Sequence, residues 1–457
     1  MPGQIKDHQR AGDSVRGATT HLAGRADQAA VRRTNLALVL RALRGGPRTR
    51  PQLAVDTRLT KATVSSLVAE LAERGLARTH QATSQGVVGR PGQRVELVGE
   101  RVLALGLELN VDYLAAVGLD LGGVQRATVR TSFDVAGRGI DEVVDRAGTV
   151  LREVARKALA SDQTVLAGVG VAAPGLVDVG RGVVRVAPNL HWNDVPLRDL
   201  ISTRLARTFA FAGHHLEPAA VAVDNEANLA TFAEFSAGSD ADDRDLVYLT
   251  GGVGVGGGIV VDGRVVRGSA GFAGEVGHLA IDPEGEVCGC GRRGCWETLC
   301  GLGALLHLAG APDDPIHDHE RDLDERLDLL RDRARAGDKR TLRAFDQIGR
   351  ALGFGASMLI NLANPRLLVL GGYFARLGEF LLPAVEAELA ARVVAPELGG
   401  ARVELSRLGL WAAATGAAYA ALQPLLDDPT RVPATSAATV PASSVSRVTK
   451  TPRKETG

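Results

Sequence analysis

Cysteine and aromatic residues are scarce in this chain of 457 residues. Only four cysteines occur, and Tyr, Trp and Phe together make up 4% of the residues, so Ala, Gly, Leu and Val must fill the cores. A scattered disulfide framework is therefore excluded, and thiols that cluster in one short segment suit a reducing compartment. The cysteine usage predicts a cytoplasmic protein.

Long apolar runs are also lacking. No stretch of 18 or more apolar residues occurs, which argues against a membrane-spanning helix. Residues 1–26 are polar, contain glycine and have no apolar stretch that could form the core of a signal peptide. Residues 427–457 are rich in Pro, Ser and Thr and end in basic residues. Both segments are therefore expected to be disordered tails.

The net charge is zero, but the charge is unevenly distributed. Residues 1–100 contain 16 Lys and Arg against 8 Asp and Glu, which gives +8, so the rest of the chain carries −8. A basic segment joined to an acidic remainder is typical of a nucleic-acid-binding module fused to a different domain. A solvated basic tail is the alternative.

Residues 27–100 predict a winged helix-turn-helix domain. Apolar residues repeat at helical spacing in residues 30–44 and again between Thr60 and Gly75. Between them, Thr49 can cap a short helix that begins with Arg50 and Pro51. The apolar positions on the two longer helices are Leu36, Val39, Leu40, Leu43, Val64, Leu67, Val68 and Leu71. Helix, short helix, turn and helix is the order of a helix-turn-helix, although a plain helical bundle is the alternative.

The opposite face of the third helix carries small and polar residues that could approach the edge of a DNA groove. After this helix, "GLARTHQATSQGVVGRPGQRVELVG" predicts a strand, a glycine-containing loop and a second strand, which together would form a wing. Arg90 and Arg94 bracket Pro91 and Gly92 at its tip, where a basic loop can contact phosphates or a minor groove. The candidate DNA-contacting residues are Lys61, Ala62, Thr63, Ser65, Ser66 and Arg90.

Residues 101–426 have a different sequence pattern, in which apolar strand-like runs alternate with helical stretches. Residues 102–129 predict three strands joined by tight turns, and residues 245–271 repeat that plan. This weak internal duplication predicts two α/β lobes with a cleft between them.

Three of the four cysteines lie in one loop, in the spacing Cys288-x-Cys290-x4-Cys295. Three thiolates within eight residues, separated by glycines, can surround a soft tetrahedral ion, and the spacing differs from that of a DNA-reading zinc finger. His278 or Cys300 could supply a fourth ligand; His278 is favoured because Cys300 falls within the following helix. The loop 278–295 therefore predicts a structural Zn²⁺ site, with reduced, buried cysteines as the alternative.

Several of these segments together resemble the ROK family (repressor, open reading frame, kinase), and in particular its regulators. The resemblance covers roughly residues 30–425. It rests on "GEVGHLAIDPEGEVCGCGRRGCWE" at 274–297, supported by "GVGVAAPGLVDVGRGVVRVAPNLHWNDVPL" at 168–197, "VDNEANLATFAE" at 223–234, "INLANPRLLVLGG" at 360–372, and the N-terminal helices with "VGRPG". The resemblance implies an actin-like fold of two lobes, a monosaccharide in the cleft and a zinc ion that shapes the pocket.

The resemblance also implies where the residues of the cleft lie. Its sugar-contacting positions correspond to Asn225, Glu275, His278 and Glu297, and the catalytic base of the family's kinases corresponds to Glu226. A glutamate there is one methylene longer than the family's aspartate, and this suits hydrogen bonding to a hydroxyl better than catalysis. Asn189 in "PNLHW" is a further candidate for a sugar contact, or else a turn residue.

The nucleotide half of the cleft departs from the family's kinases. Their first phosphate turn, Asp-x-Gly-Gly-Thr, corresponds here to Glu108-Leu109-Asn110-Val111-Asp112, which lacks the paired glycines and the hydroxyl. A phosphate needs close approach of backbone N–H groups and little negative charge. The second phosphate loop keeps its glycines between 252 and 258 but has Val253 at the family's threonine. "DLGG" at 120–123 is interpreted as a hairpin turn.

These observations predict a sugar-responsive transcriptional regulator without kinase activity, and more specifically a repressor. Its expected partners are a double-stranded DNA operator, a monosaccharide or sugar phosphate, and further copies of itself as a dimer or tetramer. The alternatives are a sugar kinase with a DNA-binding appendage, and a zinc-dependent scaffold that binds no sugar.

Overall fold

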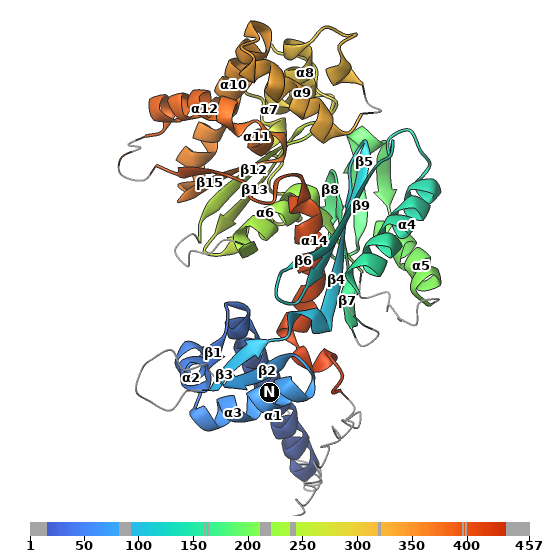
Figure 1. Cartoon of the computed structure of the whole chain (residues 1–457), viewed down its shortest axis with the longest axis vertical. Helices are drawn as coiled ribbons and strands as arrows, with labels where there is room; N and C mark the ends of the chain where they lie inside the picture. The colour runs from blue at the N-terminus through green and yellow to red at the C-terminus, as the bar shows by residue number, and fades with distance from the viewer. Residues whose placement is uncertain are drawn as a thin grey trace, which may run out of the picture. The chain divides into compact units, whose positions relative to one another are not determined.

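The computed structural model describes residues 16–81, 93–159, 161, 164–210, 221–237, 244–318, 321–394, 397 and 400–435. These residues form two units (Figure 1). The first, called the head unit, contains the residues up to Leu97 together with those from Asp428 onward. The second, called the cleft unit, runs from Val98 to Asp427.

The head unit combines three helices with a small antiparallel sheet. Their order matches the predicted winged helix-turn-helix, and the sheet order is β1-β3-β2. The elements are α1 Arg16–Arg44, β1 Arg48–Thr49, α2 Arg50–Thr57, α3 Lys61–Glu73, β2 Ala77–Gln81 and β3 Gln93–Leu97. All eight apolar positions predicted to face the core are at most 1% exposed. The loop between β2 and β3, including Arg90, lies outside the described residues.

Local hydrogen bonds explain where the helices of the head unit begin. Thr49 and Gln52 form a reciprocal capping box at the start of α2, and Pro51 lies in its first turn. The side chain of Thr60 accepts the backbone N–H of Thr63 at the start of α3. Both predicted caps are confirmed.

The head unit also contains a segment from the other end of the chain, which we call the strap (residues 428–435). It includes the 3₁₀ turn Pro429–Arg431, and Val432 is fully buried. Arg74, directly after α3, donates to the backbone oxygens of Val432 at 2.7 Å and Thr430 at 3.1 Å. The backbone N–H of Thr435 donates to the carbonyl of Glu73 at 2.8 Å.

The boundaries of the two expected tails therefore differ from those predicted. Helix α1 begins at Arg16, within the range expected to be a loose tail, and the strap belongs to the folded head unit. The strap is ordered by contacts with α3, more than 350 residues earlier in the chain, which its own composition does not encode. Residues 1–15 and 436–457 lie outside the described residues.

The first lobe of the cleft unit is built on a five-stranded sheet in the order β11-β7-β4-β5-β6. The meander β4-β5-β6 confirms the three strands predicted for residues 102–129, and the "DLGG" segment forms its second turn, with Gly123 at φ 88°. The elements of this lobe are β4 Val102–Leu109, β5 Tyr113–Asp120, β6 Gln125–Ser132, α4 Ile140–Ala158, β7 Val165–Ala173, β8 Leu176–Asp178, β9 Val183–Ala187, β10 Trp192–Val195, α5 Leu197–Ala210, β11 Val221–Asn225 and α6 Glu226–Ala237.

The second lobe carries a sheet of the same size in the order β14-β13-β12-β15-β16. Its helices and the last helix of the unit complete the two-lobed arrangement visible in Figure 1. The elements are β12 Leu246–Gly251, β13 Val255–Val261, β14 Arg264–Val265, α7 Trp296–Cys300, α8 Leu302–Ala309, α9 Leu323–Arg335, α10 Lys339–Ala363, β15 Leu367–Gly371, α11 Gly372–Arg376, α12 Gly378–Arg392, β16 Arg402–Leu405 and α14 Ala412–Asp427.

Two details of the second lobe differ from the sequence pattern. The third strand of its meander, β14, has only two residues, because the chain then turns through three glycines with positive φ, Gly268, Gly271 and Gly274. The helix expected after the cysteine loop is broken at Gly301 into α7 and α8. A Cβ atom there would lie 2.9 Å from the carbonyl oxygen of Val253, so the break lets the chain pack against the glycine-rich loop.

Helix α14 packs directly on the backbone of the first sheet. A Cβ atom on Gly106 of β4 would collide with the carbonyl oxygen of Ala414, and one on Gly170 of β7 would collide with that of Ala417. On the other side, Gly416 of α14 meets the carbonyl oxygen of Leu229 in α6. The absence of side chains at these positions allows the helix and the strands to approach closely.

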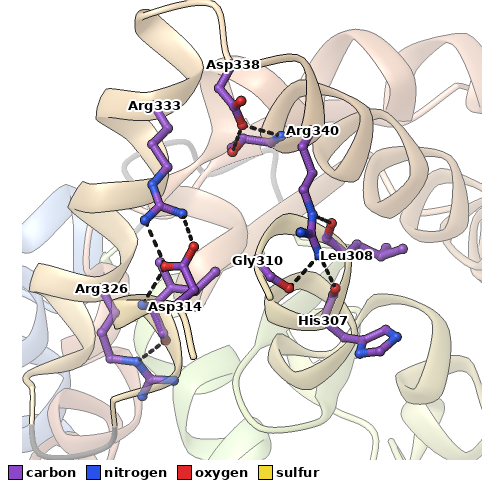
Figure 2. A network of polar contacts seen from close by, with 10 residues as sticks. His307, Leu308, Gly310, Asp314, Arg326, Arg333, Asp338 and Arg340 are labelled. Atoms are coloured by element: carbon purple, nitrogen blue, oxygen red, sulfur yellow. Dashed lines mark hydrogen bonds and ion pairs between the residues drawn. The ribbon is translucent and has the colours of Figure 1, made fainter. Parts of the chain in front are cut away.

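A polar network joins helices α8, α9 and α10 in the second lobe (Figure 2). Arg333 makes a bidentate ion pair with Asp314, with distances of 2.7 and 2.8 Å. Arg340 donates to the carbonyl oxygens of His307, Leu308 and Gly310 and so satisfies the C-terminal end of α8. Asp338 caps α10. Because these groups are matched to one another, the network is interpreted as structural.

Among the helices of the described residues, none combines the length and the apolar character needed to cross a bilayer.

Candidate functional site

The two lobes of the cleft unit enclose one cavity, and every residue predicted from the sequence to contact a sugar lines it. Asn189 comes from the 3₁₀ turn after β9, Asn225 from the end of β11, and Glu226 from the start of α6. From the second lobe, the 3₁₀ turn Val276–His278 and the residue before it supply His278 and Glu275, and helix α7 supplies Glu297. Strand ends and helix starts thus bring together residues that are more than 100 positions apart.

Asn225 has a structural task in this cavity. Its side-chain oxygen accepts the backbone N–H groups of Ala227 at 2.9 Å and Asn228 at 3.0 Å, at the start of α6. Its amide nitrogen donates to the carbonyl of Gly175 at 3.0 Å and thereby holds β11 to the turn after β7. The sequence pattern identified the residue but did not reveal that its hydrogen bonds are largely used within the protein.

Glu226 lies in an acidic environment. Burial raises the pKa of Glu226 well above its ordinary value, and the negative charges of Glu275, Glu108 and Asp224 raise it further. A carboxyl that holds its proton more tightly can donate a hydrogen bond as well as accept one, which suits a ligand rich in hydroxyl groups.

His278 connects this cavity to the cysteine loop. Its Nε2 atom lies 4.0 Å from Glu275, while its Nδ1 atom faces the loop, 3.7 Å from the sulfur of Cys288. Glu297 also reaches both sides, because its Oε1 atom lies 3.4 Å from His278 Nδ1 and accepts from Cys288 at 2.8 Å. The cavity and the cysteine loop therefore share side chains.

Four side chains form a compact cluster of possible metal ligands, namely His278, Cys288, Cys290 and Cys295. Their ligand atoms all lie within 4.8 Å of one another, and the sulfurs of Cys290 and Cys295 are 3.7 Å apart. In a tetrahedral zinc site two sulfurs lie about 3.8 Å apart, and a sulfur and an imidazole nitrogen about 3.6 Å. The shorter separations already match this geometry, and the longest would contract by about 1 Å on binding. The donor set therefore fits a tetrahedral metal ion.

The backbone of the loop supports this cluster. The N–H group of Cys290 donates to the sulfur of Cys288 at 3.4 Å. Gly294 has φ 70°, and a Cβ atom on it would collide with the carbonyl oxygen of Asp282. Cys300 is not part of the cluster; it is fully buried and its sulfur faces the carbonyl of Trp296. Of the two candidates for a fourth ligand, the geometry therefore favours His278.

The thiols of the loop differ in acidity. Burial raises the pKa of Cys288 and of Cys295. Burial also acts to raise the pKa of Cys290, but hydrogen bonds from the backbone of Arg292 and from Cys288 outweigh it and lower the pKa to about 7. Cys290 is therefore the thiol that would lose its proton most readily.

The turn between β4 and β5 lies at the position of the family's first phosphate turn, and it uses a backbone N–H donor within the turn itself. The backbone N–H of Val111 donates to the side chain of Asn110 at 2.7 Å, so it is not available to a phosphate. Glu108, at the end of β4, is 4% exposed and accepts from the hydroxyl of Tyr113 at 2.7 Å. Its side chain places a carboxyl where a nucleotide phosphate would need backbone donors.

The glycine-rich loop between β12 and β13 also faces a carboxylate. Glu297 packs against Gly254 so closely that a Cβ atom there would collide with its Oε2 atom. The carbonyl of Gly252 accepts from the backbone of Leu302 at the start of α8. The loop therefore has a local packing role that requires glycine without any nucleotide.

Some lining residues were missed as possible ligand contacts from the sequence. Glu108, Tyr113, Tyr248 and Thr250 line the same cavity. In the sequence, Glu108 indicates only that the first phosphate turn is lost. Its charge in an otherwise apolar strand is the signal that could have indicated a ligand contact.

The predicted DNA-contacting residues lie together on α3 of the head unit. Lys61, Ala62, Ser65 and Ser66 are exposed. Thr63 is half-buried, and its backbone N–H and hydroxyl both bond to Thr60. Arg90 lies outside the described residues.

Comparison with known proteins identifies the class of protein that this fold and cleft represent. The model of the ROK family matches residues 149–424, more than half of the chain. The chain therefore belongs to the ROK family, and the predicted family and actin-like two-lobed fold are confirmed.

Individual relatives include both regulators and kinases. The chain is 28% identical over 407 residues to the xylose repressor of Bacillus spizizenii, covering 88% of this chain and 98% of the relative. A crystal structure of a ROK family transcriptional regulator, a homologue of the E. coli MLC protein, is similar at 26% identity and a TM-score of 0.66, covering 87% of this chain and 97% of that one. A ROK family glucokinase from Streptomyces griseus, in complex with glucose and AMPPNP, has 27% identity and a TM-score of 0.58, covering 70% of this chain and 99% of the kinase.

Proposed function

We propose that this protein is a sugar-responsive transcriptional repressor, with a DNA-binding head unit and a sugar effector in the cleft. The observation that carries the proposal is the pairing of an intact sugar side of the cleft with a closed first phosphate turn. The six polar candidates converge on the cavity, whereas the N–H of Val111 is taken by Asn110. The similarity to proteins named as repressors over most of the chain supports the same conclusion.

The head unit supplies the proposed contact with DNA. Helix α3 presents Lys61 and small side chains on an exposed face that could enter a major groove. Arg90, at the predicted tip of the wing, would support binding through phosphates. A symmetric operator would require at least a dimer, so we also propose a homo-oligomer, and access to the chromosome implies the cytoplasm.

The metal cluster would hold Zn²⁺ through His278, Cys288, Cys290 and Cys295. When bound, the ion would fix the loop and the imidazole rather than activate a substrate, because four protein ligands leave no open position. His278 would then present Nε2 to the cavity while Nδ1 faces the ion, an orientation consistent with its distances to Glu275 and Cys288.

The decisive experiment measures DNA occupancy with and without sugar. Genomic footprinting of the full chain should show a small set of protected promoters whose protection falls when an effector is added, with xylose as the first sugar to test because of the named relatives. In vitro, Lys61→Glu should weaken operator binding by about tenfold or more, because it reverses a charge on the exposed face of α3. Lys157→Glu, the same change on an exposed lysine of the cleft unit, should leave binding unchanged.

A sugar kinase is the second candidate, because Glu226 keeps a carboxyl at the position of the kinase base and the second phosphate loop keeps its glycines. An assay of ADP release with ATP and a panel of hexoses, pentoses and amino sugars separates the two. Turnover at about 1 s⁻¹ or faster would support the kinase, whereas binding of sugar without ADP release supports the repressor.

A further inference from the structure

The ionisable side chains that line the cleft are almost all acidic. Five carboxyl side chains line it, whereas none of the described residues that line it is a lysine or an arginine. The five are Glu108, Asp112, Glu226, Glu275 and Glu297. His278 is the basic group among them, and its Nδ1 atom faces the cysteine cluster.

The two arginines beside the cleft each pair with a carboxylate, although Nε and Nη2 of Arg130 and Nη1 of Arg267 have no hydrogen-bond partner. Arg130 lies over the ring of Tyr113, 4.4 Å from its centroid, but donates to Asp324 at 2.9 Å. Arg267 pairs with Asp224 at 2.7 Å. A metal ion in the cluster would not change the sign, because two positive charges would be outweighed by three thiolates. A further anion in the cleft would therefore meet carboxyl groups, with no lysine or arginine among the described lining residues to neutralise it.

Glu108 adds a specific polar group on the first lobe. One of its oxygens accepts from Tyr113 at 2.7 Å and from Asn110 at 3.2 Å, whereas Oε2 is buried and has no hydrogen-bond partner. A buried acceptor without a partner is costly, and a ligand hydroxyl that donates to it would remove that cost. A phosphate dianion placed at this oxygen would have no proton to donate.

We propose that the cleft selects an uncharged sugar and rejects its phosphorylated or carboxylated forms, with Glu108 as the residue on the first lobe that accepts a hydroxyl of the ligand. This inference rests on the proposed function and narrows its effector. It implies that the protein senses a sugar before any phosphorylation step, so a kinase acting on that sugar would remove the signal.

Isothermal titration calorimetry on the full chain, with matched ligand pairs, tests the proposal. The pairs are glucose with glucose 6-phosphate, glucose with glucuronate, and xylose with xylose 5-phosphate. At least one neutral sugar should bind, and its anionic counterpart should bind about 100-fold more weakly or not at all. If an anionic member binds as tightly as its neutral counterpart, the inference is overturned while the proposed sugar effector stands. If neither member of any pair binds, both fail.

A variant tests the role of Glu108 directly. Glu108→Gln keeps an oxygen that can accept from Tyr113 but replaces the unpartnered oxygen with a donor. The affinity for the neutral sugar should fall about tenfold or more, and its ratio to the affinity for the phosphate should narrow. Glu153→Gln, the same change on an exposed carboxyl of α4, should alter neither quantity. An unchanged affinity in a folded Glu108→Gln protein would refute this role, and the ligand pairs on the unmodified chain decide the charge selection if the variant does not fold.

Discussion

Arg74→Met should release the strap from the head unit. The guanidinium of Arg74 makes two hydrogen bonds to strap carbonyls and one to Glu70, and its side chain is 19% exposed. A methionine keeps most of the apolar stem but none of these donors. At about 1 kcal/mol for each of the two hydrogen bonds to the strap, the strap should lose about 2 kcal/mol of its free energy of docking.

Hydrogen exchange is the suitable assay, because residues 1–97 and 428–457 contain no Phe, Trp or Tyr and fluorescence would therefore report on the cleft unit alone. The N–H of Thr435, which donates to the carbonyl of Glu73, should exchange roughly 30-fold faster in the variant. Arg78→Met removes an exposed pairing with Glu96 and should change exchange of the strap little. Unchanged protection at Thr435 in Arg74→Met would refute the view that Arg74 anchors the strap.

Three further perturbations probe the cleft unit. Cys295→Ser should abolish stoichiometric zinc, measured by elemental analysis, whereas Cys300→Ser should retain it; equal metal content in the two variants would contradict the ligand assignment. Gly106→Ala should destabilise the unit by about 3 kcal/mol or more in chemical denaturation, because the new methyl group meets backbone atoms of α14, whereas an alanine at Gly139, which has nothing within 4 Å, should change stability little. Because the pKa of Glu226 is raised on folding, its contribution to stability is present at low pH and is lost as the pH rises through that pKa; Glu226→Gln should therefore flatten the pH dependence of unfolding above the ordinary carboxyl range, and an unaltered profile would show that the group is not perturbed.

Local sequence signals were sufficient where the determining contacts are local. Thr49 and Thr60 predicted helix starts because a cap acts within three residues of its own position. The cysteine loop was recognisable because three of its four candidate ligands lie within eight residues and glycines mark its turns. The family resemblance then placed the remaining polar residues in one cleft.

The sequence did not predict features whose contact partner is distant in the chain. Nothing in the composition of residues 428–435 indicates that Arg74 will hold them, and nothing near Gly301 indicates that a helix must break to meet the glycine-rich loop. The cap role of Asn225 and the unpartnered oxygen of Glu108 likewise depend on the folded surroundings. Such features require coordinates because the sequence records the residue but not its neighbour.

The strap has a consequence for the order in which the parts of the protein can fold during synthesis. During translation, the ribosome makes α1–α3 first, but residues 428–435 emerge only after the whole cleft unit has been synthesised. The N-terminal helices therefore gain their last packing partner only after the cleft unit has been made. A product truncated anywhere within the cleft unit would therefore carry an incomplete head unit.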